Sequence, residues 1–596
     1  MKKKKHIGFI ICFILTLFVM VAVLELNKNR IIGFAITLLV SGFYVYAFIT
    51  RLKQKKMLHR FFLYLLWIAS FGAAFAISYP KVKPVPAVDY KNPVKTGIVQ
   101  TQNGAVQGVV TEDGAVEIYA GIPYAKPPVG ELRWKEPQDP DNWEGVRPAD
   151  KFAPMSMQPV NSPIYDSLAQ IIGYHDYKIS LKDNYLPPVS EDSLYVNIWK
   201  PATTETNLPV VVYVHGGSLQ TGQPWYDDYS GQGLAREGVI VVNMGYRLGV
   251  FGYYADEELI AESENDTTGN YGLLDQIKAL KWVNDNIEAF GGDPTNITLS
   301  GESAGSASVS AICASPLAKG LFTRAVMESS TVVPVSPTHS FRLLDEALKS
   351  GKELKERYSC DTIADLRAVS AEKLVGEADT QHHMTVDGYA LAKTPYEYYM
   401  DGEFNEQQVI HGYNRHEADA FLIFSAANLK NYEGRVRDYF KEYSDEVLKL
   451  YPATTNDEAK ANWSEIWGAI FFDYPHYCYN RLSVMNGVPT YQYYFTKENG
   501  RLGAWHSGEE VYLYGNIPVD SKLYDDYDRK LSDSMLQYFV NFAKTGNPNG
   551  EGLPEWQQNT ASEDVMEFGD NFGMIKEREH ELFAILDKMQ GFSTKH

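Results

Sequence analysis

The chain has 596 residues, of which 45% are hydrophobic and 22% are charged, which excludes a disordered chain and allows a large core. The first 95 residues carry 15 Lys or Arg against only Glu25 and Asp89, whereas the whole chain has a formal net charge of -20. The rest of the chain is therefore strongly acidic, and its repulsion of phosphate groups argues against nucleic acid as a partner.

Three apolar runs open the chain, and each is near the length that crosses about 30 Å of hydrocarbon. They occupy residues 7–26, 31–50 and 61–79. Three runs argue against a single cleaved signal peptide, and the first run also lacks a small-residue cleavage site. We therefore predict a membrane domain with three transmembrane helices over residues 1–79.

The placement of positive charge predicts the orientation of this domain. Lys2–Lys5 precede the first run, and five Lys or Arg lie within residues 51–60, in the loop before the third run. Because such clusters stay on the cytoplasmic side, we predict a multi-pass protein of the cell membrane whose remaining chain is extracytoplasmic. Four prolines within residues 80–97 predict an extended linker to the second domain, residues 98–596.

In this second domain, short apolar strand patterns alternate with longer helical patterns, which is typical of a mostly parallel sheet flanked by helices. Apolar residues recur at helical spacing from Leu273 to Phe290, and Gly291 and Gly292 then end that helix. The predicted strands are Val210–Val214, Val239–Val242, Ala325–Met327 and Tyr491–Phe495. An α/β fold class follows.

A candidate nucleophile follows this helix. Ile297–Leu299 form a predicted strand, Gly301–Gly305 read G-E-S-A-G, and an Ala- and Ser-rich helical segment comes next. In a strand, G-x-S-x-G, helix order, the serine occupies a strained turn that projects its hydroxyl group. The flanking glycines leave room for that turn. Ser303 is therefore the predicted nucleophile.

A second glycine-rich turn lies earlier in the chain. The predicted strand Val210–Val214 leads directly into His215, Gly216, Gly217 and Ser218. Backbone N–H groups in such a turn can converge on the nucleophile and stabilise the negative oxygen of a tetrahedral intermediate. The alternative interpretation is an ordinary loop.

Several stretches of residues 98–590 together resemble the type B carboxylesterase and cholinesterase family. They are GIPYAKPPVGELRW, SEDSLYVNIW, YRLGVFGYY, GNYGLLDQIKALKWVNDNIEAFGGDP, GESAG and NFAKTGNPN, in the order and approximate spacing of that family. The resemblance implies an α/β-hydrolase fold and a Ser, Glu, His triad in that chain order.

The resemblance assigns the triad residue by residue. Ser303 matches the nucleophile, and His506, in the stretch GAWHSGEEVYLYG, matches the base. The acid of the family lies in a Gly-x-Asn-x-x-Glu stretch, which residues 412–417 fit. Glu417 is therefore the expected acid, and Asp419 is the alternative carboxylate.

The resemblance also implies an oxyanion hole made by the backbone N–H groups of Gly217, Ser218 and Ala304. Ser218 stands where many members of the family have a third glycine. The donor is a backbone group, so this substitution is compatible with the role. Trp225 and Tyr226 follow this turn closely, and among the aromatic residues they are the leading candidates to line a substrate site.

Together these features predict a serine carboxylic-ester hydrolase that acts through an acyl-enzyme on small or medium esters, with no metal or organic cofactor. The four cysteines show neither metal-like spacing nor a disulfide framework. One alternative is a catalytically silent, cholinesterase-like adhesion or receptor ectodomain. Such relatives characteristically lose the nucleophile, whereas all three triad positions are filled here. A lipase or peptidase with the same triad is a second alternative.

Overall fold

The computed structural model describes residues 4–52, 56–88, 93–160, 186–335, 340–377, 381–499, 503–519, 521–559, 564–576 and 581–594. Contacts within the chain define two units. The first comprises Met1–Pro84 and Val160–Pro188, and the second comprises Val85–Pro159 and Val189–His596. The first unit holds the N-terminal helices, and the second holds the sheet.

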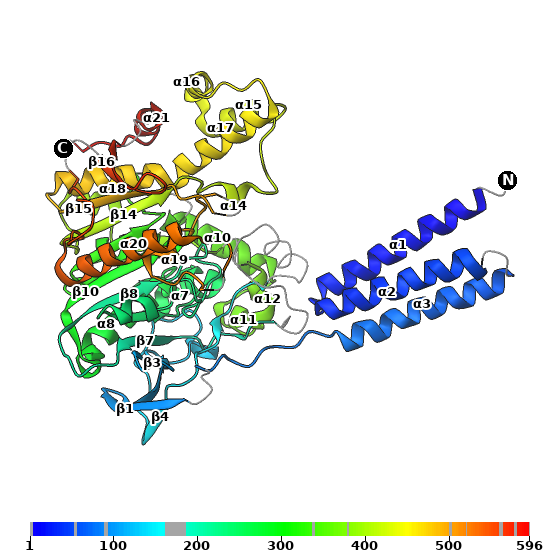
Figure 1. Ribbon diagram of the computed structural model, residues 1–596, viewed down its shortest axis with the longest axis horizontal. Coiled ribbons are helices and arrows are strands. Elements are labelled where there is room, and N and C mark those ends of the chain that lie inside the picture. The colour runs from blue at the N-terminus through cyan, green and yellow to red at the C-terminus, as the bar shows by residue number, and fades with distance from the viewer. Residues whose placement is uncertain are drawn as a thin grey trace. The chain divides into compact units, whose positions relative to one another are not determined.

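Long apolar helices build the first unit (Figure 1). They are α1 (Lys4–Leu26), α2 (Ile31–Ala47), which continues into a π-helical turn (Phe48–Leu52), and α3 (Met57–Ile77). By length and composition, Ile31–Arg51 and Met57–Ile77 can each cross a membrane. The described apolar part of α1 runs only from Ile10 to Leu26, which is shorter than the ~20 residues that a span needs. Two of the three predicted spans therefore meet this requirement.

Aromatic packing holds these helices together. The indole ring of Trp67 in α3 stacks on Phe13 in α1 and on Tyr44 in α2, with centroid distances of 4.6 and 5.4 Å. The indole N–H of Trp67 also donates a hydrogen bond to Ser41 Oγ (2.9 Å). The three helices thus share one buried aromatic cluster with a polar contact inside it.

A 13-stranded sheet forms the centre of the second unit in the described part of the chain. The strand order is β1-β2-β3-β7-β9-β8-β10-β11-β14-β15-β16-β17, with β4 beside β2. The strands are β1 (Val94–Thr101), β2 (Gly104–Val110), β3 (Val116–Pro123), β4 (Val146–Pro148), β7 (Tyr195–Pro201), β8 (Leu208–Val214), β9 (Ile240–Met244), β10 (Gly292–Glu302), β11 (Arg324–Glu328), β14 (Gln408–Asn414), β15 (Thr490–Phe495), β16 (Asp564–Phe568) and β17 (Gly573–Lys576). From β9 to β16 every neighbouring pair is parallel, so the predicted mostly parallel sheet is confirmed.

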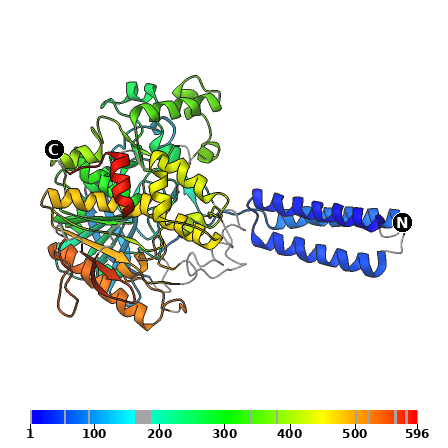
Figure 2. The ribbon, with the colours of Figure 1, turned by 90° about the horizontal axis from the view of Figure 1, so that it is seen from above.

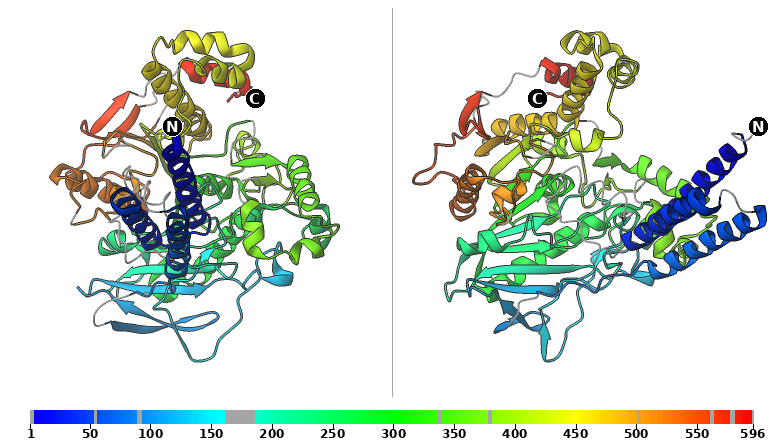
Figure 3. Two further views of the ribbon diagram at one scale, coloured as in Figure 1. Left: turned by 90° about the vertical axis from the view of Figure 1, so that its right-hand side faces the viewer. Right: turned by 45° about the vertical axis from the view of Figure 1, so that its right-hand side comes forward.

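Helices cover both faces of this sheet. The helices of the second unit are α5 (Gln232–Arg236), α6 (Gly249–Tyr253), α7 (Glu257–Glu262), α8 (Tyr271–Asn286), α9 (Ala304–Ala314), α10 (Leu344–Arg357), α11 (Ile363–Arg367), α12 (Ala371–Leu374), α13 (Pro395–Met400), α14 (Asp419–Leu422), α15 (Tyr432–Phe440), α16 (Ser444–Leu450), α17 (Asn456–Gly468), α18 (Tyr474–Met485), α19 (Glu510–Leu513), α20 (Asp526–Thr545) and α21 (Glu581–Gln590). Helices α18 and α20 lie on opposite sides of the sheet (Figure 2). Near the C-terminus, α21 packs against α16 (Figure 3).

The side chains of β8 show how the two layers form. Val210, Val212 and Val214 belong to the core that contains α8 and α9, whereas Val211 and Tyr213 belong to the core that contains α20. Successive side chains of a strand point to opposite faces, so a strand that is buried on both faces must be apolar throughout. Every residue of β8 is buried, as this rule requires.

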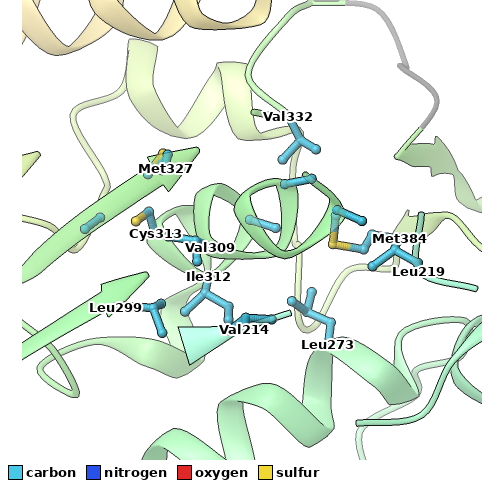
Figure 4. Packing of buried hydrophobic residues seen from close by; sticks show 14 of the residues in the cluster. Val214, Leu219, Leu273, Leu299, Val309, Ile312, Cys313, Met327, Val332 and Met384 are labelled. Atoms are coloured by element: carbon cyan, nitrogen blue, oxygen red, sulfur yellow. The ribbon is translucent and has the colours of Figure 1, made fainter. Parts of the chain in front are cut away.

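Helix α9 lies in the first of these cores (Figure 4). Its Val309, Ile312 and Cys313 pack among Leu299 of β10 and Met327 of β11. Each of these side chains is fully buried. The segment that follows Ser303 is therefore held rigidly against the sheet.

Part of the segment predicted as a linker, residues 80–97, lies within the second unit. Val94 and Lys95 already pair with Val110 and Val109 as the first residues of β1. Residues 86–88 are also docked, because Phe152 N–H donates to Pro86 O and Val88 N–H donates to Asp150 O, both at 2.9 Å. Backbone hydrogen bonds therefore hold these residues of segment 80–97 against the rest of the second unit.

Candidate active site

Ser303 occupies the turn between β10 and α9. Its backbone has φ 54° and ψ -125°, a conformation that side-chain-bearing residues rarely adopt. The surrounding structure holds this strained turn, since Ser303 N–H donates to Glu328 O (2.8 Å) and Ala307 N–H donates to Ser303 O (2.9 Å). The predicted order of strand, turn and helix is confirmed.

The glycines on either side of Ser303 are required by close packing. A Cβ atom at Gly305 would lie 2.0 Å from Val214 O, and one at Gly301 would lie 2.8 Å from the same oxygen. The end of β8 thus approaches the turn so closely that neither position has room for a side chain. This approach brings the loop after β8 next to Ser303.

Ser303, His506 and Glu417 form one chain of hydrogen bonds. His506 Nε2 lies 2.8 Å from Ser303 Oγ, and His506 Nδ1 lies 2.5 Å from Glu417 Oε2. Glu417 Oε1 accepts a hydrogen bond from the backbone N–H of Asn414 (2.7 Å). Three residues that are far apart in the sequence therefore meet at one point.

The alternative acid, Asp419, has a different partner. It lies at the start of α14 and accepts a hydrogen bond from the hydroxyl group of Ser464. The imidazole of His506 is instead bonded to Glu417, which is only 2% exposed. The geometry therefore favours Glu417 as the partner of His506.

The predicted oxyanion donors have unpaired backbone amides. Within the described part of the chain, the N–H groups of Gly217, Ser218 and Ala304 have no acceptor. Gly217 and Ser218 have φ values of 105° and 56°, so the loop after β8 adopts a conformation that favours glycine even at Ser218. A Cβ atom at Gly216 would lie 3.1 Å from Ser303 Cβ, which places this loop directly beside the serine.

Burial sets the protonation of the base. His506 is 4% exposed, and this burial lowers its pKa to about 4. The imidazole is therefore neutral at pH 7, and Nε2 can accept the proton of Ser303. Burial also raises the pKa of Glu417 to about 8, and the hydrogen bond from Asn414 N–H opposes this rise. The positive charge that His506 gains when it takes the serine proton favours the ionised form of Glu417 during the reaction.

Four further buried carboxyl groups near the hydrogen-bonded residues Ser303, His506 and Glu417 were not predicted from the sequence. They are Glu302, Glu328, Glu509 and Glu510, which accept hydrogen bonds from Ser507, Ser300, Ser329 and Tyr213 respectively. Burial and mutual repulsion raise the pKa of each of them. Glu302 lies 3.2 Å from His506 Nε2, so it is the closest of the four to the reacting atoms. The presence of Glu302 inside the G-x-S-x-G motif was the one available signal.

Two aromatic side chains lie beside the base. The rings of Phe472 and Phe421 lie 4.7 and 5.1 Å from the His506 ring. Trp225 stacks on Phe152 (5.8 Å) and Tyr226 packs against Tyr229 (5.8 Å), and the expectation that they lie near a substrate stays a prediction. Phe421 follows Glu417 by four residues, which places it on the short helix α14 next to the site.

The described residues contain no group of three or more His, Cys, Asp or Glu that can hold a metal ion. All four cysteines are free thiols, and Cys313 and Cys478 are buried.

Comparison with known proteins identifies the relatives of this chain. A sequence profile described as "Carboxylesterase family" matches residues 95–584. The chain belongs to the carboxylesterase family. Carboxylesterase 1C of Rattus norvegicus is 31% identical over 514 residues, which cover 80% of this chain and 90% of that protein. Fumonisin B1 esterase of Sphingopyxis macrogoltabida is 31% identical over 503 residues, which cover 79% and 86%.

The solved structure of a PNB esterase resembles this carboxylesterase with a TM-score of 0.68 and 30% identity, over 82% of this chain and 99% of that chain. The predicted α/β-hydrolase fold and the predicted carboxylic-ester hydrolase activity are confirmed. The helices α1, α2 and α3 lie before the first residue that the family profile matches.

Proposed function

We propose that Ser303, His506 and Glu417 are the catalytic triad, and that the enzyme hydrolyses small or medium carboxylic esters through an acyl-enzyme. The observation that carries this proposal is the continuous chain from Ser303 Oγ through both imidazole nitrogens to Glu417. A nucleophile, a base and an orienting carboxylate in hydrogen-bond reach are the groups that acyl transfer requires.

In the first half of the reaction, Ser303 Oγ attacks the ester carbonyl carbon while His506 Nε2 takes the hydroxyl proton. The carbon–oxygen bond to the alcohol then breaks, and His506 returns the proton to the departing alcohol. Glu417 accepts the Nδ1–H of His506 throughout, which fixes the tautomer and stabilises the imidazolium. The product is an ester of Ser303 with the acyl group.

In the second half, a water molecule attacks the acyl-enzyme and gives its proton to His506. The bond to Ser303 Oγ breaks, His506 protonates that oxygen, and the carboxylic acid leaves. The amides of Gly217, Ser218 and Ala304 donate to the negative oxygen in both tetrahedral intermediates. Each such donor contributes about 3 kcal/mol in the transition state. These amides have no acceptor among the described residues, which leaves them available for this role.

The test compares full-length protein in detergent with its Ser303→Ala variant on p-nitrophenyl acetate and butyrate. We expect the variant to lose activity by at least about 10³-fold, because no other group replaces the nucleophile. Equal turnover by wild type and variant would refute the triad. A folded protein inactive on both esters would instead favour the partner-binding ectodomain.

We further propose that α1, α2 and α3 each cross the cell membrane and that the catalytic unit is extracytoplasmic. Helix α1 in full has 23 residues and contains the whole apolar run 7–26, which reaches the ~20 residues that a span needs. Lys2–Lys5 and the positive residues within 51–60 support this orientation. A membrane-impermeant fluorophosphonate that reacts with Ser303 should label the protein in intact cells. Labelling only after permeabilisation would place the catalytic unit on the cytoplasmic side.

A further inference from the structure

The segments that carry the triad acid and base run side by side. His416 and Trp505 form an isolated parallel bridge, with His416 N–H donating to Ala504 O (2.9 Å). The side-chain amide of Asn414 donates to Trp505 O (2.8 Å). Glu417 is the residue after His416, and His506 is the residue after Trp505. The spacing between these two backbones therefore sets the spacing between the acid and the base.

The side chain of His416 adds a contact of its own. Its Nδ1 atom accepts a hydrogen bond from the backbone N–H of Ala504 (3.2 Å). An amide can only donate, so this imidazole carries its proton on Nε2. Ala504 is fully buried, and water is therefore not available to replace the acceptor.

The fit around Nδ1 is tight on its other side. Gly503 has φ 68°, and a Cβ atom at this position would lie 2.4 Å from His416 Nδ1. The chain at 503–504 therefore approaches the imidazole as closely as a glycine allows. Ala504 is bonded to His416 through both its N–H and its C=O group, so the pair acts as a two-point clamp.

We propose that His416 is a positioning residue, which holds the segment of His506 at the correct distance and angle from Glu417. This inference rests on the proposed triad and deepens it. The hydrogen bonds of His416 join it to the backbone of Ala504 rather than to Ser303. Its effect should therefore fall on the chemical step and leave substrate binding largely intact, since small displacements of catalytic groups cost up to about 10²-fold in rate.

Three substitutions separate the hydrogen bond from the bulk of the side chain. His416→Asn retains an acceptor near the position of Nδ1, His416→Gln moves the amide beyond it, and His416→Leu removes the acceptor. We expect kcat for p-nitrophenyl butyrate to fall about ten- to a hundredfold in the Leu and Gln variants, with KM changed less than about threefold. The Asn variant should keep at least half of the wild-type kcat.

Arg415→Leu is the matched control, because this neighbouring side chain is exposed and, among the described residues, forms a single 3.8 Å ion pair, with Glu498. All variants are measured as full-length protein in detergent, with the thermal midpoint beside the kinetics. If the Leu variant fails to fold, the comparison of Asn with Gln decides. Equal kcat in those two variants, or a loss that appears in KM alone, would overturn the positioning role. Absence of Ser303-dependent activity in the wild type would instead refute the proposed triad.

Discussion

Glu417 and Asp419 are two residues apart, yet their carboxyl groups have different surroundings. Glu417 is buried and bonded to His506, whereas Asp419 accepts its hydrogen bond from Ser464. The sequence could rank them only by their register in the Gly-x-Asn-x-x-Glu stretch. The structure separates them because β14 ends at Asn414 and the chain then turns toward His506.

This difference predicts opposite outcomes for two matched substitutions. Glu417→Gln should lower kcat by about 10³- to 10⁴-fold, because a neutral amide no longer stabilises the imidazolium or fixes its tautomer. Asp419→Asn should change kcat less than about threefold, since its carboxylate does not contact the base. Steady-state kinetics on p-nitrophenyl butyrate would measure both. A larger loss in the Asn variant than in the Gln variant would reassign the acid.

The remaining polar residues around the base could not be found from the sequence. Glu328 and Ser329 are adjacent at the end of β11, whereas Glu509 lies just before α19, and no short motif joins these two segments. Only the fold brings the C-terminal ends of β10, β11 and β14 together in the register Ser300↔Val326 and Met327↔His411. Motifs therefore predicted the reacting groups, whereas their neighbours depend on strand pairing.

At the scale of elements, apolar patterning predicted what is buried on both faces. The four predicted strands correspond to β8, β9, β11 and β15. The predicted helix Leu273–Phe290 corresponds to α8, which ends at Asn286, and to a 3-10 turn over Ile287–Phe290 that Gly291 (φ 88°) ends. The strand before Ser303 was underestimated. The predicted strand was Ile297–Leu299, whereas β10 runs from Gly292 to Glu302. Regular pairing with β8 begins at Ile297, and an irregularity in register separates it from the single pair Gly292↔Leu208.

The N-terminal helices show the same limit. Length and hydrophobicity predicted three helices, and the structure contains all three, with two long enough to span a membrane by themselves. The aromatic cluster of Phe13, Tyr44 and Trp67 was not predicted, because these residues lie on three different helices. A hydropathy pattern identifies a span without identifying the face that packs.

At the scale of the whole molecule, burial in the second unit shifts the pKa values of histidine and of glutamate side chains in opposite directions. Burial lowers the pKa of His215 and His506 to about 4 and that of His411 to about 3. Burial raises the pKa of Glu509 to about 7, and other buried Glu side chains shift in the same direction. Folding therefore favours neutral histidines and protonated carboxyl groups together.

These shifts predict a stability maximum in mildly acidic solution. The histidines titrate near ~6.5 when unfolded, so their contribution is complete above that pH and is lost as the pH falls toward 4 and below. The buried Glu side chains titrate near ~4.3 when unfolded, so their contribution is complete below that pH and is lost as the pH rises through about 7. Between about pH 4.3 and 6.5 the two effects on the free energy of unfolding oppose each other. Below this range only the histidines lower the stability as the pH falls, and above it only the Glu side chains lower the stability as the pH rises.

The urea midpoint of the second unit should therefore be highest between about pH 4.3 and 6.5 and should decline from pH 6.5 to 8. Tryptophan fluorescence of the full-length protein in detergent would follow this transition. Glu510→Gln should flatten the alkaline decline, because a neutral amide still accepts a hydrogen bond from Tyr213 and has no charge to bury. A wild-type midpoint that keeps rising up to pH 8 would mean that the buried carboxyl groups are ionised in the folded protein.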